Sequence, residues 1–242
     1  MAFMNRFLPA SLILASMVTA SSQEWTRFRG PNGTGKSDTP GLPVTWTGTD
    51  YNWKVKLPGT GHSSPVLWGD RIFLGCANAG TGRFEAVCLS AEDGSVIWKQ
   101  SHPFGTYETH KFNSFASGTF ALDGERVYYV RQHGDHCYLT ALTHDGKPVW
   151  EIPLGPFQSQ HGTGHSPIVH GELVVLAYDQ MAEGRILAVD RRTGKLRWQI
   201  PRSPGKADYS VPCAYTQPGQ PERLLFNSGE DGICAVDPAT GE

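Results

Sequence analysis

The sequence predicts an all-β fold built from repeated four-stranded antiparallel sheets. Three observations predict it: 28 Gly and 17 Pro among 242 residues, tryptophans at nearly equal spacing, and a turn motif before most of them. Glycine and proline oppose long helices, whereas aromatic side chains favour sheets. The 21 Lys and Arg nearly balance the 23 Asp and Glu. This balance gives no general electrostatic case for binding nucleic acid or an acidic membrane surface.

The repeat is clearest at residues 188–198, which read AxDxxTGxxxW. A second copy starts at Ala235, and weaker copies cover residues 90–98 and 143–150. The glycines of the four copies are Gly94, Gly146, Gly194 and Gly241. The repeated tryptophans are Trp53, Trp98, Trp150 and Trp198, separated by 45, 52 and 48 residues. Such self-similarity is the signature of a repeat architecture.

Each repeat unit is expected to form four short strands, which in the third unit cover residues 167–170, 173–178, 186–190 and 196–201. Gly194 supplies the positive φ that the last hairpin needs. A sheet of about 45 residues cannot bury both faces alone, so the copies must stack as the blades of a β-propeller. We expect each tryptophan to pack between neighbouring blades and to donate its indole N–H to a backbone carbonyl of the next blade.

These residues resemble the tryptophan-docking repeat of the pyrroloquinoline-quinone (PQQ) propellers. That superfamily includes the quinoprotein alcohol dehydrogenases and the outer-membrane assembly factor BamB. Residues 25–35 also resemble the WxxFRGPxGxG opening of secreted, BamB-like bacterial proteins. Since propellers of this superfamily usually close with eight blades, the resemblance implies an incomplete propeller of about four blades.

The chain is expected to comprise three parts. Residues 1–22 have the basic start, the short apolar core and the small-residue exit of a signal peptide, which predicts export to the periplasm or outside a bacterial cell. No transmembrane helix is expected after its cleavage. A Gly- and Pro-rich arm covers residues 23–50, and propeller blades cover 51–242, with the last blade truncated. Either the chain is a fragment, or the strand around Trp53 completes the fourth blade of a closed four-bladed ring.

The arm contains the pattern GxxxxGK[ST] at residues 30–37. A phosphate-binding loop of this pattern needs a buried strand before it and a helix after it. Here a polar, arginine-rich segment precedes the pattern, and Pro40 follows it. We therefore expect no nucleotide there, and we interpret the loop as packing the arm onto the propeller.

The candidate site lies in a loop that occurs twice, as Gly-Thr-Gly-His-Ser at residues 59–63 and 162–166. In a propeller this loop connects the outer strand of one blade to the inner strand of the next, and such loops meet at one mouth of the central channel. The candidate ligand-binding residues in the four loops are His62, Ser63, Ser64, Asn113, His165, Ser166, Asp208 and Tyr209. They suit a polar ligand, a peptide or an ion, or else they satisfy backbone groups at tight turns.

No catalytic residue or metal-ligand set is assigned from the sequence. The histidines of His133-Gly-Asp-His136 are expected in a solvated hairpin turn, and the five cysteines form no CxxC pair and at most two disulfides. The resemblance to quinoprotein dehydrogenases would require adjacent cysteines, Ca²⁺ ligands and a catalytic Asp. No cysteines are adjacent here, and the other positions cannot be matched.

The first functional hypothesis is a non-enzymatic interaction scaffold or ligand-binding module of the cell envelope, with no established cofactor. Its partner would be an envelope protein or a small polar ligand. One alternative is a fragment of a PQQ- and Ca²⁺-dependent alcohol or sugar dehydrogenase that lacks its cofactor residues. The other is a metal-dependent enzyme that uses the channel-mouth histidines His62 and His165.

Overall fold

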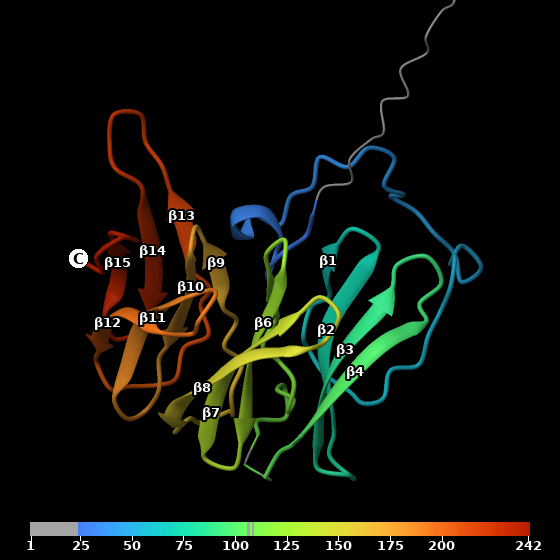
Figure 1. Cartoon of the computed structure of the whole chain (residues 1–242), viewed down its shortest axis with the longest axis horizontal. Coiled ribbons are helices and arrows are strands. Elements are labelled where there is room, and N and C mark those ends of the chain that lie inside the picture. The colour runs from blue at the N-terminus through green and yellow to red at the C-terminus, as the bar shows by residue number, and fades with distance from the viewer. Residues whose placement is uncertain (1–23, 106, 108) are drawn as a thin grey trace, which may run out of the picture.

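The prediction of an all-β propeller fold is confirmed by the computed structural model, which describes residues 24–105, 107 and 109–242. In these residues fifteen strands form four antiparallel sheets that lie side by side in chain order, and one short 3-10 helix lies outside the sheets (Figure 1). The predicted signal peptide, residues 1–22, lies outside the described residues. Among the described residues, no helix has the length and apolar content needed to cross a membrane.

The first three sheets have four strands each, paired in sequence order, and the fourth has three. The first sheet comprises β1 (Val66–Trp68), β2 (Arg71–Asn78), β3 (Arg83–Ser90) and β4 (Val96–Pro103). The second comprises β5 (Ala121–Leu122), β6 (Arg126–His133), β7 (His136–Thr143) and β8 (Pro148–Pro156). The third comprises β9 (Ile168–His170), β10 (Leu173–Tyr178), β11 (Gly184–Asp190) and β12 (Leu196–Arg202), and the fourth β13 (Cys213–Tyr215), β14 (Arg223–Ser228) and β15 (Gly232–Val236). The strands predicted for the third repeat are therefore confirmed to within two residues.

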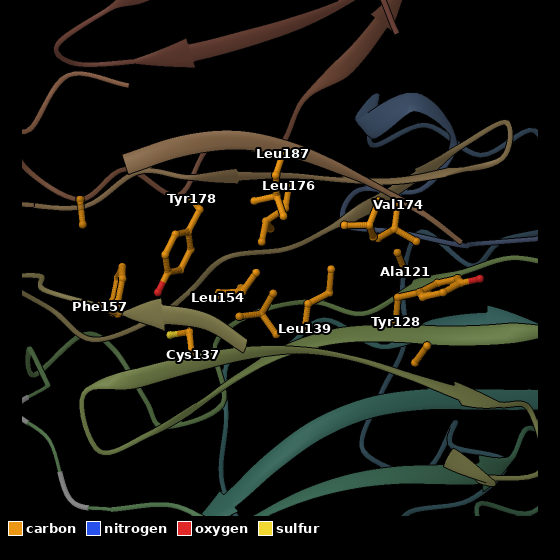
Figure 2. Packing of buried hydrophobic residues seen from close by; sticks show 14 residues of the cluster. Ala121, Tyr128, Cys137, Leu139, Leu154, Phe157, Val174, Leu176, Tyr178 and Leu187 are labelled. Atoms are coloured by element: carbon orange, nitrogen blue, oxygen red, sulfur yellow. The ribbon is translucent and has the colours of Figure 1, made fainter. Parts of the chain in front are cut away.

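The core consists of apolar layers between successive sheets. Phe73 of the first sheet packs with Tyr129 of the second, and Leu176 of the third packs with Leu139 of the second (Figure 2). A third layer joins the third and fourth sheets through residues such as Phe226. Because both faces of the middle sheets are covered, their central strands are continuous apolar runs such as Leu-Val-Val-Leu-Ala-Tyr in β10. All five cysteines are free thiols.

The segment around Trp53 belongs beside the first sheet. Its indole N–H donates to the backbone oxygen of Ala91 at 3.0 Å, in the turn after β3. Residues 51–57 form no strand, and the fourth sheet consists of β13, β14 and β15 among the described residues. The hypothesis that this segment completes the fourth blade of a four-bladed ring is therefore wrong.

The N-terminal arm crosses the first strands of three sheets. Trp25 pairs with Leu67 of β1 as an isolated antiparallel bridge, and Thr26 accepts a hydrogen bond from the backbone of Leu122 in β5. The helix η1 (Pro31–Gly33) then brings Asn32 against β13. The arm thus links sheets that are distant in sequence.

The GxxxxGK[ST] pattern forms a closed loop within this arm. The backbone N–H groups of Gly30, Gly33, Thr34 and Gly35 all donate to carbonyl oxygens of residues 27–31. The residues that follow, 36–40, are not helical. The N–H groups that a phosphate group would need as donors are thus used within the loop itself.

Candidate functional site

Four loops lead into the first strands of the four sheets and are hydrogen-bonded to one another in order. The backbone N–H of His62 donates to the oxygen of Ala116 at 3.0 Å. The side-chain amide of Asn113 donates to the backbone oxygen of His161 at 2.6 Å. The hydroxyl of Tyr209 donates to the backbone oxygen of Gly162 at 2.7 Å. These contacts hold the four loops together at one end of the strands.

The loops enclose an open cavity of about 480 Å³. Every one of the four loops contributes to its lining, which consists of His62, His110, Phe112, Asn113, Ser117, His161, Gly164 and Tyr209. Three of the eight predicted ligand-binding residues, His62, Asn113 and Tyr209, are among them. The other five, His110, Phe112, Ser117, His161 and Gly164, were not among the candidates, although His161 immediately precedes the predicted loop at residues 162–166.

Three imidazoles give the cavity its chemical character. The rings of His110 and His161 meet edge to face, with their centroids 4.7 Å apart. Nδ1 of His110 accepts a hydrogen bond from the backbone of Phe112 at 3.2 Å, whereas Nδ1 of His161 is buried and has no partner among the described residues. His62 is exposed. The cavity therefore presents imidazole nitrogens that the described part of the chain does not fully occupy.

His165 has a structural environment that differs from that of His62. Its side chain is 2 % exposed and packs against Tyr178 and Tyr209. Nε2 donates to the backbone oxygen of Asp179 at 3.2 Å, which leaves Nδ1 to accept from the hydroxyl of Thr163 at 3.0 Å. Burial lowers the pKa of His165 to about 4, so the ring is neutral at pH 7. His165 does not line the cavity.

The remaining predicted residues take part in hydrogen bonds that hold loops and strands together. Ser63 Oγ accepts from the N–H of Gly75 at 3.2 Å, and Ser166 Oγ accepts from that of Thr119 at 2.9 Å. The backbone of Ser64 donates to Thr119 Oγ1. Asp208 accepts from the N–H of Gly229 at 2.6 Å. These contacts are of the turn-stabilising kind, so the structure does not bring these side chains to the cavity.

The four repeated tryptophans all lie at the boundary between one sheet and the next. Each indole N–H donates to a backbone oxygen of the following repeat: Trp53 to Ala91, Trp98 to His144, Trp150 to Arg191 and Trp198 to Pro238, at 2.7–3.0 Å. Each ring also lies on a glycine of that turn, namely Gly94, Gly146, Gly194 or Gly241. A Cβ at any of these glycines would come within 2.5–3.0 Å of the indole.

The described residues contain no group of three His, Cys, Asp or Glu side chains arranged to hold a metal ion. At the hairpin between β6 and β7, His136 Nδ1 contacts Asp135 at 2.7 Å and His133 Nδ1 lies 3.0 Å from the oxygen of Pro103. Both histidines are thus engaged locally, in an exposed turn.

The cavity does not match the needs of a Ca²⁺-bound quinone. PQQ carries three carboxylates, which call for cationic partners, and Ca²⁺ calls for six to eight oxygen ligands. Among residues 24–105, 107 and 109–242, those that line the cavity include no Asp, Glu, Lys or Arg. The only side-chain amide oxygen among these described residues, that of Asn113, already accepts a hydrogen bond from Ser117. The described lining of the cavity therefore does not fit this cofactor.

The sequence profile of one family, described as outer membrane protein assembly factor BamB, matches residues 46–210. Among solved structures, the chain is similar to BamB from Moraxella catarrhalis, with a TM-score of 0.50 and 17 % identity over 79 % of this chain and 53 % of that one. No curated protein sequence matches the chain.

Two dehydrogenases are also similar in structure. The quinohemoprotein alcohol dehydrogenase from Comamonas testosteroni has a TM-score of 0.60 and 16 % identity, over 91 % of this chain and 40 % of that one. A europium-containing methanol dehydrogenase has a TM-score of 0.55 and 14 % identity, over 75 % and 40 %. At such identities the likeness concerns the fold alone. The chain spans about half the length of the BamB structure and less than half of the two dehydrogenases.

Proposed function

The chain belongs to the family of the outer membrane protein assembly factor BamB, and on that premise we propose that it is an exported binding module of the cell envelope. The single observation that carries this proposal is the convergence of all four connecting loops on one cavity of about 480 Å³. A pocket of this size, lined by aromatic rings and a few polar groups, is the usual form of a binding site. Export is inferred from the leader-like composition of residues 1–22.

The cavity suits an uncharged polar group, such as an exposed loop of a partner protein. Phe112 is 76 % exposed and offers an apolar contact surface. The imidazoles of His62, His110 and His161 offer both donors and acceptors. Asn113 is held by its hydrogen bonds to His161 and Ser117, so its side chain is pre-oriented for binding.

Binding by this cavity is tested with a pair of histidine variants. The immobilised mature chain, a His62→Ala/His161→Ala double variant and a His136→Ala control would be exposed to the same bacterial envelope extract, and the retained proteins quantified. We expect wild type and control to retain the same proteins, and the double variant to retain at least about tenfold less, the equivalent of 1.4 kcal/mol. Equal retention by the double variant and wild type would contradict binding at the cavity. If wild type retained no protein, the proposal that the chain binds an envelope protein would be wrong.

A further inference from the structure

A second open cavity, of about 390 Å³, borders the loop at residues 157–164. His161 and Gly164 of this loop line the cavity described above, whereas Ser159 and Gly162 line the second one. Among the described residues, the two cavities have no lining residue in common. The second cavity is therefore a separate place for a ligand.

Most of the lining of this second cavity comes from three segments that are hydrogen-bonded to one another. They are the β6–β7 hairpin, the loop at 157–164 and the β10–β11 hairpin. The backbone N–H of Phe157 donates to the oxygen of Asp135 at 2.7 Å, and that of Met181 donates to the oxygen of Gln158 at 2.9 Å. The side chain of Gln132 also bonds to both the first hairpin and the loop. The walls are thus fixed before a ligand binds, which lowers the entropic cost of binding.

Two aromatic rings and a thioether belong to the lining. The ring of Phe157 is 4 % exposed and packs on Tyr178 with the centroids 5.5 Å apart (Figure 2). The ring of Tyr107 packs edge to face on Phe115, with the centroids 4.8 Å apart. Met181 is 51 % exposed. Aromatic rings suit a planar cation, and the flexible thioether suits an aliphatic chain.

Asp135 gives the second cavity a negative charge. Its side chain is 81 % exposed, and its Oδ1 lies 2.7 Å from Nδ1 of His136. This hydrogen bond holds the pKa of Asp135 below its usual range, so the carboxyl group is ionised at pH 7. The lining that the structure describes includes no Lys or Arg to offset the charge. The cavity therefore favours a cation.

We propose that the second cavity binds the guanidinium group of an arginine side chain that a partner protein presents. The planar cation would pair with the carboxylate of Asp135 and lie against the rings of Tyr107 and Phe157, which an ammonium group cannot do with a flat face. The aliphatic part of the side chain would contact Met181. The proposal does not depend on the histidine-lined cavity, so the two sites can be tested separately.

The methyl signal of Met181 in an NMR spectrum reports on this cavity, because Met181 is the only methionine after residue 22. The mature chain, labelled with ¹³C at the methionine methyl group, would be titrated with N-acetylarginine methylamide and with its uncharged analogue, N-acetylcitrulline methylamide. A Met181→Leu variant identifies the signal. We expect the arginine compound to shift the signal to saturation and the citrulline compound to bind at least about threefold more weakly. An unmoved signal, or equal binding of the two compounds, would overturn the proposal.

Free arginine is a third compound for the same titration. N-acetylarginine methylamide resembles an arginine within a polypeptide, whereas free arginine carries a carboxylate that Asp135 repels. We expect free arginine to bind more weakly than the blocked compound. Tighter binding of free arginine would mean that the cavity takes a small molecule and would overturn the assignment to a partner protein.

The role of the carboxylate is tested with a matched pair of variants. Asp135→Asn should bind N-acetylarginine methylamide at least about threefold more weakly than wild type. Since Asp135 is exposed, the variant should keep the wild-type circular dichroism spectrum. Asp70→Asn, whose side chain is 90 % exposed in the turn between β1 and β2, serves as the control and should bind like wild type. Equal affinity of wild type and Asp135→Asn would contradict the pairing with the guanidinium group.

Discussion

Asn32 and Ala214, 182 residues apart, are joined by two hydrogen bonds. The amide nitrogen of Asn32 donates to the oxygen of Ala214 at 2.8 Å, and the backbone N–H of Ala214 donates to Asn32 Oδ1 at 2.7 Å. The side chain thus makes both bonds that a neighbouring strand would make with this residue of β13. Through this contact the N-terminal arm, which also pairs with β1, connects the first and fourth sheets.

Loss of the Asn32 side chain should therefore destabilise the fold. Asn32 has a φ of 48°, which glycine adopts without strain. Asn32→Gly then isolates the two hydrogen bonds and should lower the free energy of unfolding by about 1–2 kcal/mol, measured by urea denaturation. Asn32→Ala should cost about 1 kcal/mol more, because its Cβ disfavours positive φ. Equal stability of wild type and Asn32→Gly would show that the arm does not brace the sheets.

The contact between Trp150 and Gly194 should be measurable as a coupling. A Cβ at Gly194 would lie 2.9 Å from the indole, at a φ of +70°. Gly194→Ala should therefore cost about 2 kcal/mol or more of unfolding free energy in the wild-type background. With Trp150→Ala the steric clash is gone, and the same substitution should cost less by at least about 0.5 kcal/mol.

The indole N–H of Trp150 can be tested separately. Trp150→Phe retains an aromatic ring but loses the bond to the oxygen of Arg191. The expected loss is about 1 kcal/mol, because the hydroxyl of Tyr128, 3.2 Å from that oxygen, makes its shorter hydrogen bond to Asp123, at 2.7 Å. Additive losses for Trp150→Ala and Gly194→Ala would contradict the contact of the indole with Gly194.

The sheets and the tryptophan contacts could be predicted from the sequence because short, contiguous segments of the chain determine them. A blade is one contiguous repeat, so the Thr-Gly turn and the tryptophan a few residues later recur at fixed spacing. The arm contact of Asn32 was not accessible, since nothing in the sequence near Asn32 indicates that Ala214 is its partner.

The sequence could not predict which loop side chains line the cavity, and His62 and His165 show the physical reason. Both follow Gly-Thr-Gly, yet only His165 is buried. In the third sheet Tyr178 packs on that histidine with ring centroids 5.2 Å apart. The register of β1 on β2 and of β9 on β10 places Cys76 at the corresponding position of the first sheet. The environment of a loop histidine thus depends on a neighbouring strand rather than on its own motif.

The lining of the cavity predicts no quinone-dependent activity for this chain. With PQQ and Ca²⁺ added, the protein should not oxidise alcohols or sugars in a dye-reduction assay, because the lining residues that the structure describes include no Asp, Glu, Lys or Arg. A reconstituted quinoprotein dehydrogenase provides the positive control. Alcohol-dependent dye reduction that requires both additives would place the dehydrogenase hypothesis first.

The buried His165 should make the fold less stable as the pH falls. Its pKa is lowered from 6.5 to about 4 by burial, so between these values the unfolded chain binds the proton that the folded chain excludes. This loss of unfolding free energy is absent above pH 6.5 and grows as the pH falls towards 4. At pH 5 it should amount to about 2 kcal/mol of lost stability. His102 is also partly buried, with a pKa near 4, and should add to the same trend.

A neutral side chain in place of His165 separates its part of the pH dependence of stability from that of the other titrating groups. His165→Gln should lower the stability at pH 7.5 through imperfect packing, but its unfolding free energy should fall less than that of wild type between pH 7.5 and pH 5. His136→Gln, in the exposed β6–β7 hairpin, should keep the wild-type dependence. If His165→Gln and wild type lost the same free energy over this interval, the imidazole of His165 would already be accessible to protons in the folded protein.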